Sequence, residues 1–438
     1  MMRRDDPSTQ SRTTNPTIRG EDPSGSADGG VPMVADEASP LRVLVLLNVF
    51  EIGGTQLNAI DLASQLRHHG VDSQLFAYSV GASTEALLQE YAKSRGETIA
   101  SLPRQNKGLV STRQISDLAR SHSADLIHVF GYSDLIHYSF WGGCALGRRP
   151  MVMTIYEMYI PSGIPRHQRM IVGTRQLAED QAGRPGGVEL ISPPVDIERD
   201  DRLLVDCEPF LAEHGLSDTA LRVGIISRLD TIMKARAVAD AITAVGELSA
   251  QTPVQLVVVG SGDAEAHLRA LAHSVNRTRG WDCVKFTGAL SDPRPAYASS
   301  DVVVGMGGSA ARALSFGRPL VVSGENGWYR TFEPTSATRL FRDSFWSLER
   351  MADPVGSLRA CLSPLLADPS KRRDLGMFGR QFAADNFALS EMAKKTAHIY
   401  RAARQDKARF SRWMRDVPQE RGPVFRGLRS VPLTLRRY

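Results

Sequence analysis

Residues 221–322 decide the fold, through the four segments "LRVGIISRLDTIMKARA" (221–237), "VQLVVVGSGD" (254–263), "VKFTGALSD" (284–292) and "DVVVGMGGSAARALSFGRPLVV" (301–322). Short runs of β-branched residues alternate here with helical segments, and glycine, serine or a cation stands at most of the strand ends. This alternation predicts an open parallel sheet, which binds its ligand where the strands end and the helices begin.

Two cations, Arg228 and Lys234, lie in the turn after the first of these strands, just before the helical segment "ARAVADAITAVGEL". Arginine can hold phosphate oxygens with two hydrogen bonds, and lysine adds a compact point charge. The pair predicts a clamp for a diphosphate that also stabilises it as a leaving group, so we assign both residues catalytic roles. The alternative is that they are two unrelated surface cations.

Further ligand candidates stand at the ends of the other strands in this half. A glycine follows "VVV" before a helix, and backbone groups after "VKFT" are placed to contact a base edge. The helix that starts after "DVVVGM" predicts an anion site, because the first N–H groups of a helix are unpaired. The residues concerned are Gly260, Gly288, Ala289, Leu290, Gly307, Gly308 and Ser309.

The N-terminal half repeats the alternation. The apolar run "RVLVLLNVF" (42–50) is typical of a strand buried on both faces, and "LNAIDLASQLRHHG" (57–70) has the spacing of a helix. Gly53 and Gly54 lie between them, with Thr55 as the expected helix cap, and predict a close approach to an anion or a hydroxyl. A tight turn without a ligand explains the two glycines equally well.

A later strand, "PMVMTIYEMY" (150–159), ends in Tyr156 and Glu157, ahead of a loop that contains proline and glycine. We assign these two residues catalytic roles, against the alternative that they are solvated residues at the rim of the sheet. His128 lies inside an apolar run, which favours a hydrogen-bonded core histidine over a catalyst.

Charge is distributed unevenly. Residues 401–438 contain ten Arg and one Lys against three acidic residues, a net charge of +8, which leaves −3 for the rest of a chain whose total is +5. A basic end favours an anionic partner surface, lipid or nucleic acid, and a solvated flexible end explains it equally well. The four scattered cysteines predict neither a disulfide nor a metal site, and no apolar stretch reaches the roughly 20 residues of a membrane span.

Taken in order, "EIGGTQ", "SRLDTIMK", "VVVGSGD", "VKFTGAL" and "SSDVVVGMGGSAARALSFGRPLVV" resemble the GT-B glycosyltransferases of family 4, which are retaining and use nucleotide sugars. The resemblance covers about residues 41–387. It implies two Rossmann-like domains that face a cleft, with the donor held mainly by the second domain and the acceptor by the first. It also implies that Gly53, Gly54, Arg228 and Lys234 contact the diphosphate and that Gly288 to Leu290 hold the base.

The chain departs from that family at three positions. Family members usually have two glutamates, one for the donor sugar and one for the ribose, where this chain has Val304 and Arg312. Neither side chain accepts a hydrogen bond, so we expect Arg312 to contact a phosphate and Glu325 to take over a sugar contact. Tyr156 stands where the family often has a histidine near the reacting sugar.

These observations predict an α/β chain with two parallel-sheet domains in the GT-B arrangement. The expected divisions are a disordered segment 1–40, an acceptor domain 41–194, a donor domain 195–387, a helix 388–416 that braces the first domain, and a basic tail 417–438. Residues 195–202 ("VDIERDDR"), after Pro193 and Pro194, form the expected linker. Trp413 and Phe410 near the end of the last helix are explained either by a membrane surface or by packing on the first domain.

The resemblance favours an enzyme of the hexosyltransferase type that moves a sugar from a nucleotide diphosphate to a hydroxyl of a glycan, glycolipid or small molecule, with no metal or other cofactor. We expect a bacterial, cytoplasmic protein, with peripheral contact to an anionic membrane through its basic end and no specific nucleic acid partner. The alternatives are a scaffold that has lost transfer activity, suggested by Val304, Arg312 and Tyr156, and a sugar epimerase of the same architecture.

Overall fold

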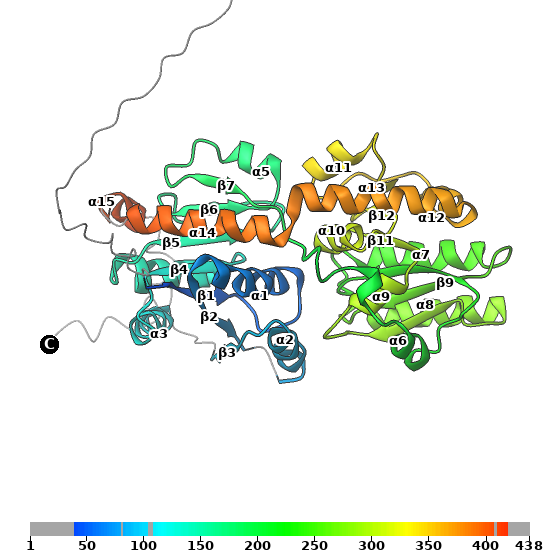
Figure 1. Ribbon diagram of the computed structural model, residues 1–438, viewed down its shortest axis with the longest axis horizontal. Coiled ribbons are helices and arrows are strands. Elements are labelled where there is room, and N and C mark those ends of the chain that lie inside the picture. Colours follow the sequence, from blue (N-terminus) through cyan, green and yellow to red (C-terminus); the bar gives the residue numbers. More distant parts are fainter. Residues whose placement is uncertain (1–38, 80–81, 104–107, 407–409, 419–438) are drawn as a thin grey trace, which may run out of the picture. The chain divides into compact units, whose positions relative to one another are not determined.

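The computed structural model describes residues 39–79, 82–103, 108–406 and 410–418 (Figure 1). The segment 1–40, predicted to be disordered, and the predicted basic tail 417–438 lie almost entirely outside these residues. No helix within the described residues is both long and apolar enough to cross a membrane.

The N-terminal half forms a seven-stranded sheet in the order β3-β2-β1-β4-β5-β6-β7, and all of its strand pairs are parallel. Its strands are β1 Leu41–Leu47, β2 Val71–Tyr78, β3 Ile99–Leu102, β4 Leu126–Phe130, β5 Met151–Ile155, β6 Arg169–Val172 and β7 Val188–Leu190. Its helices are α1 Gly54–Leu66, α2 Ala82–Ser94, α3 Gly108–Ser121, α4 Asp134–Ser139 and α5 Arg175–Asp180.

The second half forms a six-stranded sheet in the order β10-β9-β8-β11-β12-β13, in which only the last described pair, β12 with β13, is antiparallel. Its strands are β8 Leu221–Ile226, β9 Val254–Val259, β10 Val284–Gly288, β11 Val302–Gly305, β12 Leu320–Ser323 and β13 Tyr329–Thr331. Its helices are α6 Glu208–Glu213, α7 Ala235–Leu248, α8 Glu265–Arg279, α9 Arg294–Ser299, α10 Gly308–Ser315, α11 Ala337–Arg342, α12 Pro354–Ala367 and α13 Pro369–Phe387. The predicted pair of α/β domains with parallel sheets is confirmed.

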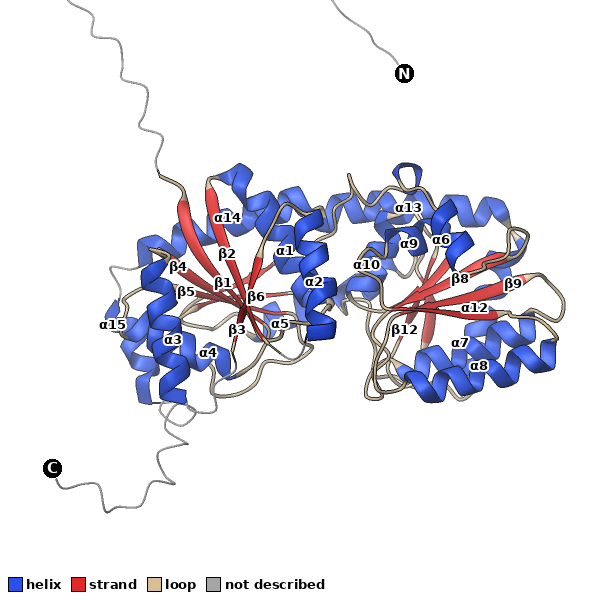
Figure 2. Cartoon of the chain, turned by 90° about the horizontal axis from the view of Figure 1, so that it is seen from below, coloured by secondary structure: helices blue, strands red, loops and turns tan. Residues whose placement is uncertain are grey.

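Helices cover both faces of each sheet, as Figure 2 shows. The alternation of side chains along a strand divides each apolar run between two cores. In β1, Val43 and Val45 join the cluster that contains α1, whereas Leu44 and Leu46 join the cluster on the other face. A strand buried on both faces therefore needs a nearly continuous apolar sequence, which is what "LRVLVLL" supplies.

The chain returns to the first sheet at its end. Helix α14 (Leu389–Gln405) packs on the core that contains β1, through residues such as Met392 and Tyr400. The short helix α15 (Phe410–Trp413) places Trp413, 3% exposed, in the core on the opposite face of the same sheet. For Trp413, packing on the first domain is therefore the explanation that the structure supports, in place of a membrane surface.

Candidate functional site

The strand order of each sheet reverses beside its first strand. In the second sheet, β9 and β11 lie on either side of β8, so the crevice at the carboxyl ends of β8 and β11 is the expected ligand site. The turn after β8 is fixed to the turn after β9. Leu229 N–H donates to Ser261 O over 2.9 Å, and Thr231 Oγ1 donates to Asp263 Oδ2 over 2.8 Å. The two cations of this turn therefore stand on a braced loop.

Lys234 is half-buried at the end of this turn, while Arg228 is exposed. Burial lowers the pKa of the Lys234 ammonium to about 8, with Arg228 acting in the same direction and the carboxylates of Asp230 and Glu325 opposing it. The predicted clamp residues are thus close enough to influence each other electrostatically. Burying a cation is unfavourable without an anionic partner, so a bound phosphate would stabilise the charged form of Lys234.

A small cavity joins Lys234 to the start of α10. It is lined by Lys234, Ser309, Ser227 and Ser323 together with apolar residues, and its volume is about 10 Å³, which is the space of about one water molecule. Sequence reasoning identified the first two of these residues and missed the two serines. Both serines could have been predicted, because each is a small polar residue at the end of an apolar strand.

Helices α1, α7 and α10, which begin at these sheet edges, lack a side-chain cap and have no acidic residue in their first turn. Uncapped N-terminal N–H groups and the positive end of the helix dipole both favour an anion. Gly307 precedes α10 with φ +56°, in the left-handed region where glycine is strongly preferred. Gly308 has open space around its Cα, with no atom within 4 Å of an added Cβ.

Gly260 has a clear structural role in addition to its predicted ligand role. Its φ is +136°, and a Cβ on it would lie 1.9 Å from Ser227 O, in the turn that carries Arg228. Gly262 is similar, because its Cβ would lie 2.4 Å from Leu229 O. These glycines allow the turns after β8 and β9 to pack against each other, and that packing positions the cations.

Gly260→Ala is therefore expected to lower the free energy of unfolding by about 3 kcal/mol, from backbone strain and overpacking together. Thermal unfolding would measure this. Gly308→Ala is the matched control, because its added methyl group meets no atom within 4 Å. Equal melting temperatures for Gly260→Ala and the wild type would contradict this reading of the turn.

The remaining candidates of the second half lie around the same edge. Gly260 N–H donates to Gly288 O over 2.8 Å, so the segment Gly288 to Leu290 leaves β10 next to the turn after β9. Gly288 has φ +80°, and the half-buried Ala289 and Leu290 follow it. Glu325 accepts a hydrogen bond from Trp346 Nε1 over 2.7 Å through one carboxylate oxygen.

At the first sheet, the structure corrects one expectation. Gly53, not Thr55, is the N-cap residue of α1, and no side chain caps this helix. Gly54 is exposed and has no atom within 4 Å of an added Cβ. Beside it, Gln56 Nε2 donates to Asn48 Oδ1 over 3.0 Å, so a buried amide from α1 is tied to the end of β1. Neither amide was among the predicted site residues.

Tyr156 and Glu157 follow β5 at the same edge. Glu157 Oε1 accepts a hydrogen bond from the Tyr132 backbone N–H over 2.8 Å, which ties the end of β5 to the end of β4. Its second oxygen, Oε2, is buried and has no hydrogen-bond partner among the described residues, and the same holds for the hydroxyl of Tyr156. Burial raises the pKa of Tyr156, so the phenol is neutral. Both residues thus present buried polar atoms without a protein partner, which is unfavourable unless a ligand satisfies them.

His128 is a hydrogen-bonded core residue, as the sequence indicated. It is fully buried, with Nδ1 2.6 Å from the Tyr400 hydroxyl and Nε2 2.7 Å from Thr154 Oγ1. Burial lowers the pKa of its imidazole to about 3, so the ring is neutral at physiological pH.

Of the three positions that depart from the resembled family, Val304 lies among apolar residues and Arg312 among charged ones. Val304 is 1% exposed in the core of the second sheet. Arg312 is 8% exposed, and its guanidinium forms ion pairs with Asp61 over 3.2 Å and with Asp200 over 3.0 Å. Its contacts are therefore with protein carboxylates, in place of the substrate phosphate expected from the sequence.

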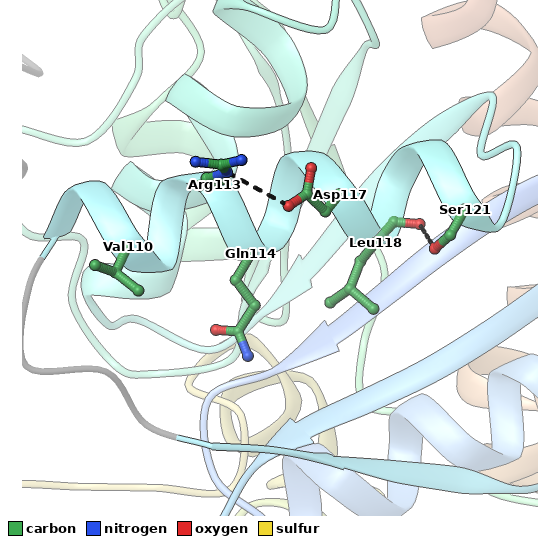
Figure 3. Close-up of a pocket in the computed structure, with 6 residues that line it drawn as sticks. All are labelled: Val110, Arg113, Gln114, Asp117, Leu118 and Ser121. Atoms are coloured by element: carbon green, nitrogen blue, oxygen red, sulfur yellow. Dashed lines mark hydrogen bonds and ion pairs between the residues drawn. The ribbon is translucent and has the colours of Figure 1, made fainter.

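A wider hollow lies elsewhere, on the outer face of α3 (Figure 3). Its volume is about 460 Å³, and its lining residues are Val110, Arg113, Gln114, Asp117, Leu118 and Ser121. An ion pair of 3.8 Å between Arg113 and Asp117 runs along the helix there. None of the predicted site residues lines this hollow.

The pKa of Lys234 predicts how nucleotide binding depends on pH. A diphosphate binds best when Lys234 is protonated, so its affinity should fall by about tenfold between pH 7 and pH 9 as the ammonium loses its proton. The last phosphate proton is lost near pH 6 and does not contribute in this range. Calorimetry with UDP, GDP and ADP measures the effect. Lys234→Arg should remove the fall, because a guanidinium stays charged at both pH values; an equal fall in that variant would contradict the assignment.

Comparison with known proteins agrees with this arrangement. Residues 220–344 match the family model described as "Glycosyl transferases group 1". The chain is also similar to a D-inositol 3-phosphate glycosyltransferase of Kineococcus radiotolerans, at 22% identity over 408 residues, which are 82% of this chain and 92% of that protein.

Two solved structures show the same fold. HepE of Anabaena, in complex with UDP-glucose, has a TM-score of 0.62 at 17% identity, over 82% of this chain and 99% of HepE. The UDP-GlcNAc 2-epimerase of Neisseria meningitidis, bound to UDP-GlcNAc, has a TM-score of 0.54 at 11% identity, over 82% and 98%. Residues 220–344 thus match a glycosyltransferase group 1 domain, in a chain with the GT-B fold.

Proposed function

We propose that the chain is a hexosyltransferase that moves a sugar from a nucleotide diphosphate to a hydroxyl acceptor with retention of configuration. The observation that carries this proposal is the half-buried Lys234, next to Arg228 and to the uncapped start of α10. Support comes from the domain match over the same residues and from the related proteins, one named a glycosyltransferase and one bound to UDP-glucose.

In the proposed reaction, the bond between the sugar C1 and the diphosphate oxygen breaks, and a bond from C1 to the acceptor oxygen forms on the same face. The acceptor hydroxyl gives its proton to the departing diphosphate. Arg228 and Lys234 stabilise the negative charge that develops on the leaving group. They therefore stabilise the transition state more than the bound ground state, which lowers the barrier. No metal is needed for this role in the proposal.

In the proposal, each sheet binds one of the two substrates. The second sheet holds the donor through Arg228, Lys234 and the start of α10, with the base at Gly288 to Leu290. The first sheet holds the acceptor near Tyr156 and Glu157, and the start of α1 approaches the diphosphate. We further propose that the enzyme is cytoplasmic and contacts an anionic membrane through its basic C-terminal end. Most of that end lies outside the described residues.

The test is a crystal soak with UDP, GDP and ADP, read for a diphosphate beside Arg228 and Lys234, followed by product analysis with the matching nucleotide sugars and hydroxyl acceptors. A glycoside whose anomeric configuration equals that of the donor is expected. An inverted product would contradict retention, and a diphosphate bound elsewhere would contradict the clamp.

Two alternatives give different results in the same experiments. A scaffold without transfer activity is favoured by the buried Val304 and the ion-paired Arg312, and it predicts that none of the nucleotides or nucleotide sugars binds in calorimetry. An epimerase is favoured by the likeness to the Neisseria enzyme, and it predicts an isomerised sugar nucleotide in place of a glycoside.

A further inference from the structure

Arg312 belongs to a group of buried side chains, four of which carry a charge. We call it the ionic cluster and define it as Asp61, Tyr91, Arg95, Asp200 and Arg312. Of these, Asp61, Asp200, Tyr91 and Arg312 are 1%, 2%, 4% and 8% exposed. Removing charges from water costs several kcal/mol per ion unless partners compensate, so the contacts within this cluster must be specific.

The contacts converge on Asp61 and Arg312. Arg312 Nη2 lies 3.2 Å from Asp61 Oδ2, and Arg312 Nε lies 3.0 Å from Asp200 Oδ2. The other oxygen of Asp61 accepts a hydrogen bond from the Tyr91 hydroxyl over 2.7 Å and lies 2.8 Å from Arg95 Nε. Both oxygens of Asp61 are therefore occupied, one by each half of the chain.

The charge of Arg312 is stable in this setting. Burial opposes it, but Asp200, Tyr91 and Asp61 together hold the pKa of the guanidinium well above its usual range. Asp200 belongs to the segment that connects the two sheets, and Arg95 is anchored to the same segment by an ion pair of 2.6 Å with Asp196. The cluster is an ionic link among α1, α2, the connecting segment and α10.

The position of the link within its helices has a functional consequence. Helix α1 starts at Gly54 and carries Asp61 about 10 Å further along its axis, and α10 starts at Gly308 and carries Arg312 about 6 Å further along. Both starts are uncapped glycine turns that favour an anion. Because a helix is rigid over one or two turns, the Asp61–Arg312 pair determines how far apart these two anion sites lie.

We propose that Arg312 is a positioning residue, which acts through Asp61 to hold the starts of α1 and α10 at the separation that a bound diphosphate requires. This rests on the proposed function and adds to it a role for a side chain that does not touch the substrate. It also explains why the position carries a cation, since its nearest partners are two buried carboxylates.

The first test uses Asp61→Asn, which preserves the shape of the side chain and removes its charge. The matched control is Asp240→Asn on α7. Asp240 is 5% exposed and has the same two kinds of partner, the Tyr329 hydroxyl at 2.7 Å and Arg236 Nε at 2.9 Å, but all three residues belong to the second half of the chain. Both variants remove the charge of a buried carboxylate, and only Asp61 lies in the link between α1 and α10.

The measurement is the Kd of UDP, GDP and ADP by calorimetry, at a temperature well below the unfolding of every variant. We expect Asp61→Asn to weaken binding of the preferred nucleotide about tenfold, and Asp240→Asn to bind as the wild type does although its melting temperature also falls. Arg312→Lys keeps the charge but cannot pair with Asp61 and Asp200 through two separate nitrogens. It should therefore weaken binding less than Asp61→Asn.

Three results would overturn the inference in distinguishable ways. Wild-type affinity in Asp61→Asn would show that the link does not position the anion sites. Equal losses in Asp61→Asn and Asp240→Asn would show a general effect of lost stability. A wild type that binds none of the three nucleotides would overturn the proposed function and this inference with it.

Discussion

Lys234→Ala is expected to lower sugar transfer by about 10²–10³-fold while the protein stays folded, which is the effect of removing one preorganised charge from a leaving-group site. Lys234 stands in a braced turn, and burial already lowers the pKa of its ammonium to about 8. The electrostatic attraction between its ammonium and a phosphate is therefore stronger than it would be for an exposed lysine. Because the leaving diphosphate gains charge in the transition state, kcat should fall more than the affinity for the donor.

Lys371→Ala provides the matched control. Lys371 is also half-buried and lies in the same half of the chain, in the first turn of α13, where no predicted site residue is found. Initial rates with a nucleotide sugar and far-ultraviolet circular dichroism of both variants complete the comparison. Full activity in Lys234→Ala would refute the clamp, and an equal loss in Lys371→Ala would point to general instability.

The parts of the fold that the sequence predicts are those with strong local patterns. The run "LRVLVLL" predicts a strand buried on both faces, and β1 is such a strand in the centre of its sheet. Strand β3, Ile99–Leu102, was missed because it is an edge strand of four residues with two exposed side chains, which leaves no apolar run to detect. The antiparallel β13 was missed for a similar reason, since three residues carry too little pattern.

The site was predictable in position but not in detail. Strand ends placed Lys234 and Ser309 correctly on one edge, because a parallel sheet brings its carboxyl ends together. Partners that are distant in sequence decided the rest. Nothing near Arg312 in the sequence indicates that Asp61, 251 residues away, would be its partner, and nothing near Gly260 indicates the backbone of Ser227.

Glu157→Gln is expected to lower transfer by about 100-fold, because it replaces an acceptor of hydrogen bonds by a donor at a buried atom. The glutamine oxygen can keep the bond from the Tyr132 N–H, so the ends of β4 and β5 stay joined. The change is confined to Oε2, which has no partner among the described residues. In the proposed function this oxygen accepts a hydrogen bond from a neighbouring hydroxyl of the acceptor and so orients the reacting hydroxyl toward the sugar.

Steady-state kinetics with donor and acceptor varied separately would locate the effect. We expect kcat to fall and the KM of the acceptor to rise, while the Kd of the free nucleotide stays unchanged, because in the proposed function Glu157 does not contact the donor. Glu189→Gln is the control, since Glu189 is exposed on β7 of the same sheet. A weaker Kd for the nucleotide in Glu157→Gln would assign Glu157 to the donor site, and unchanged kinetics would contradict its role in transfer.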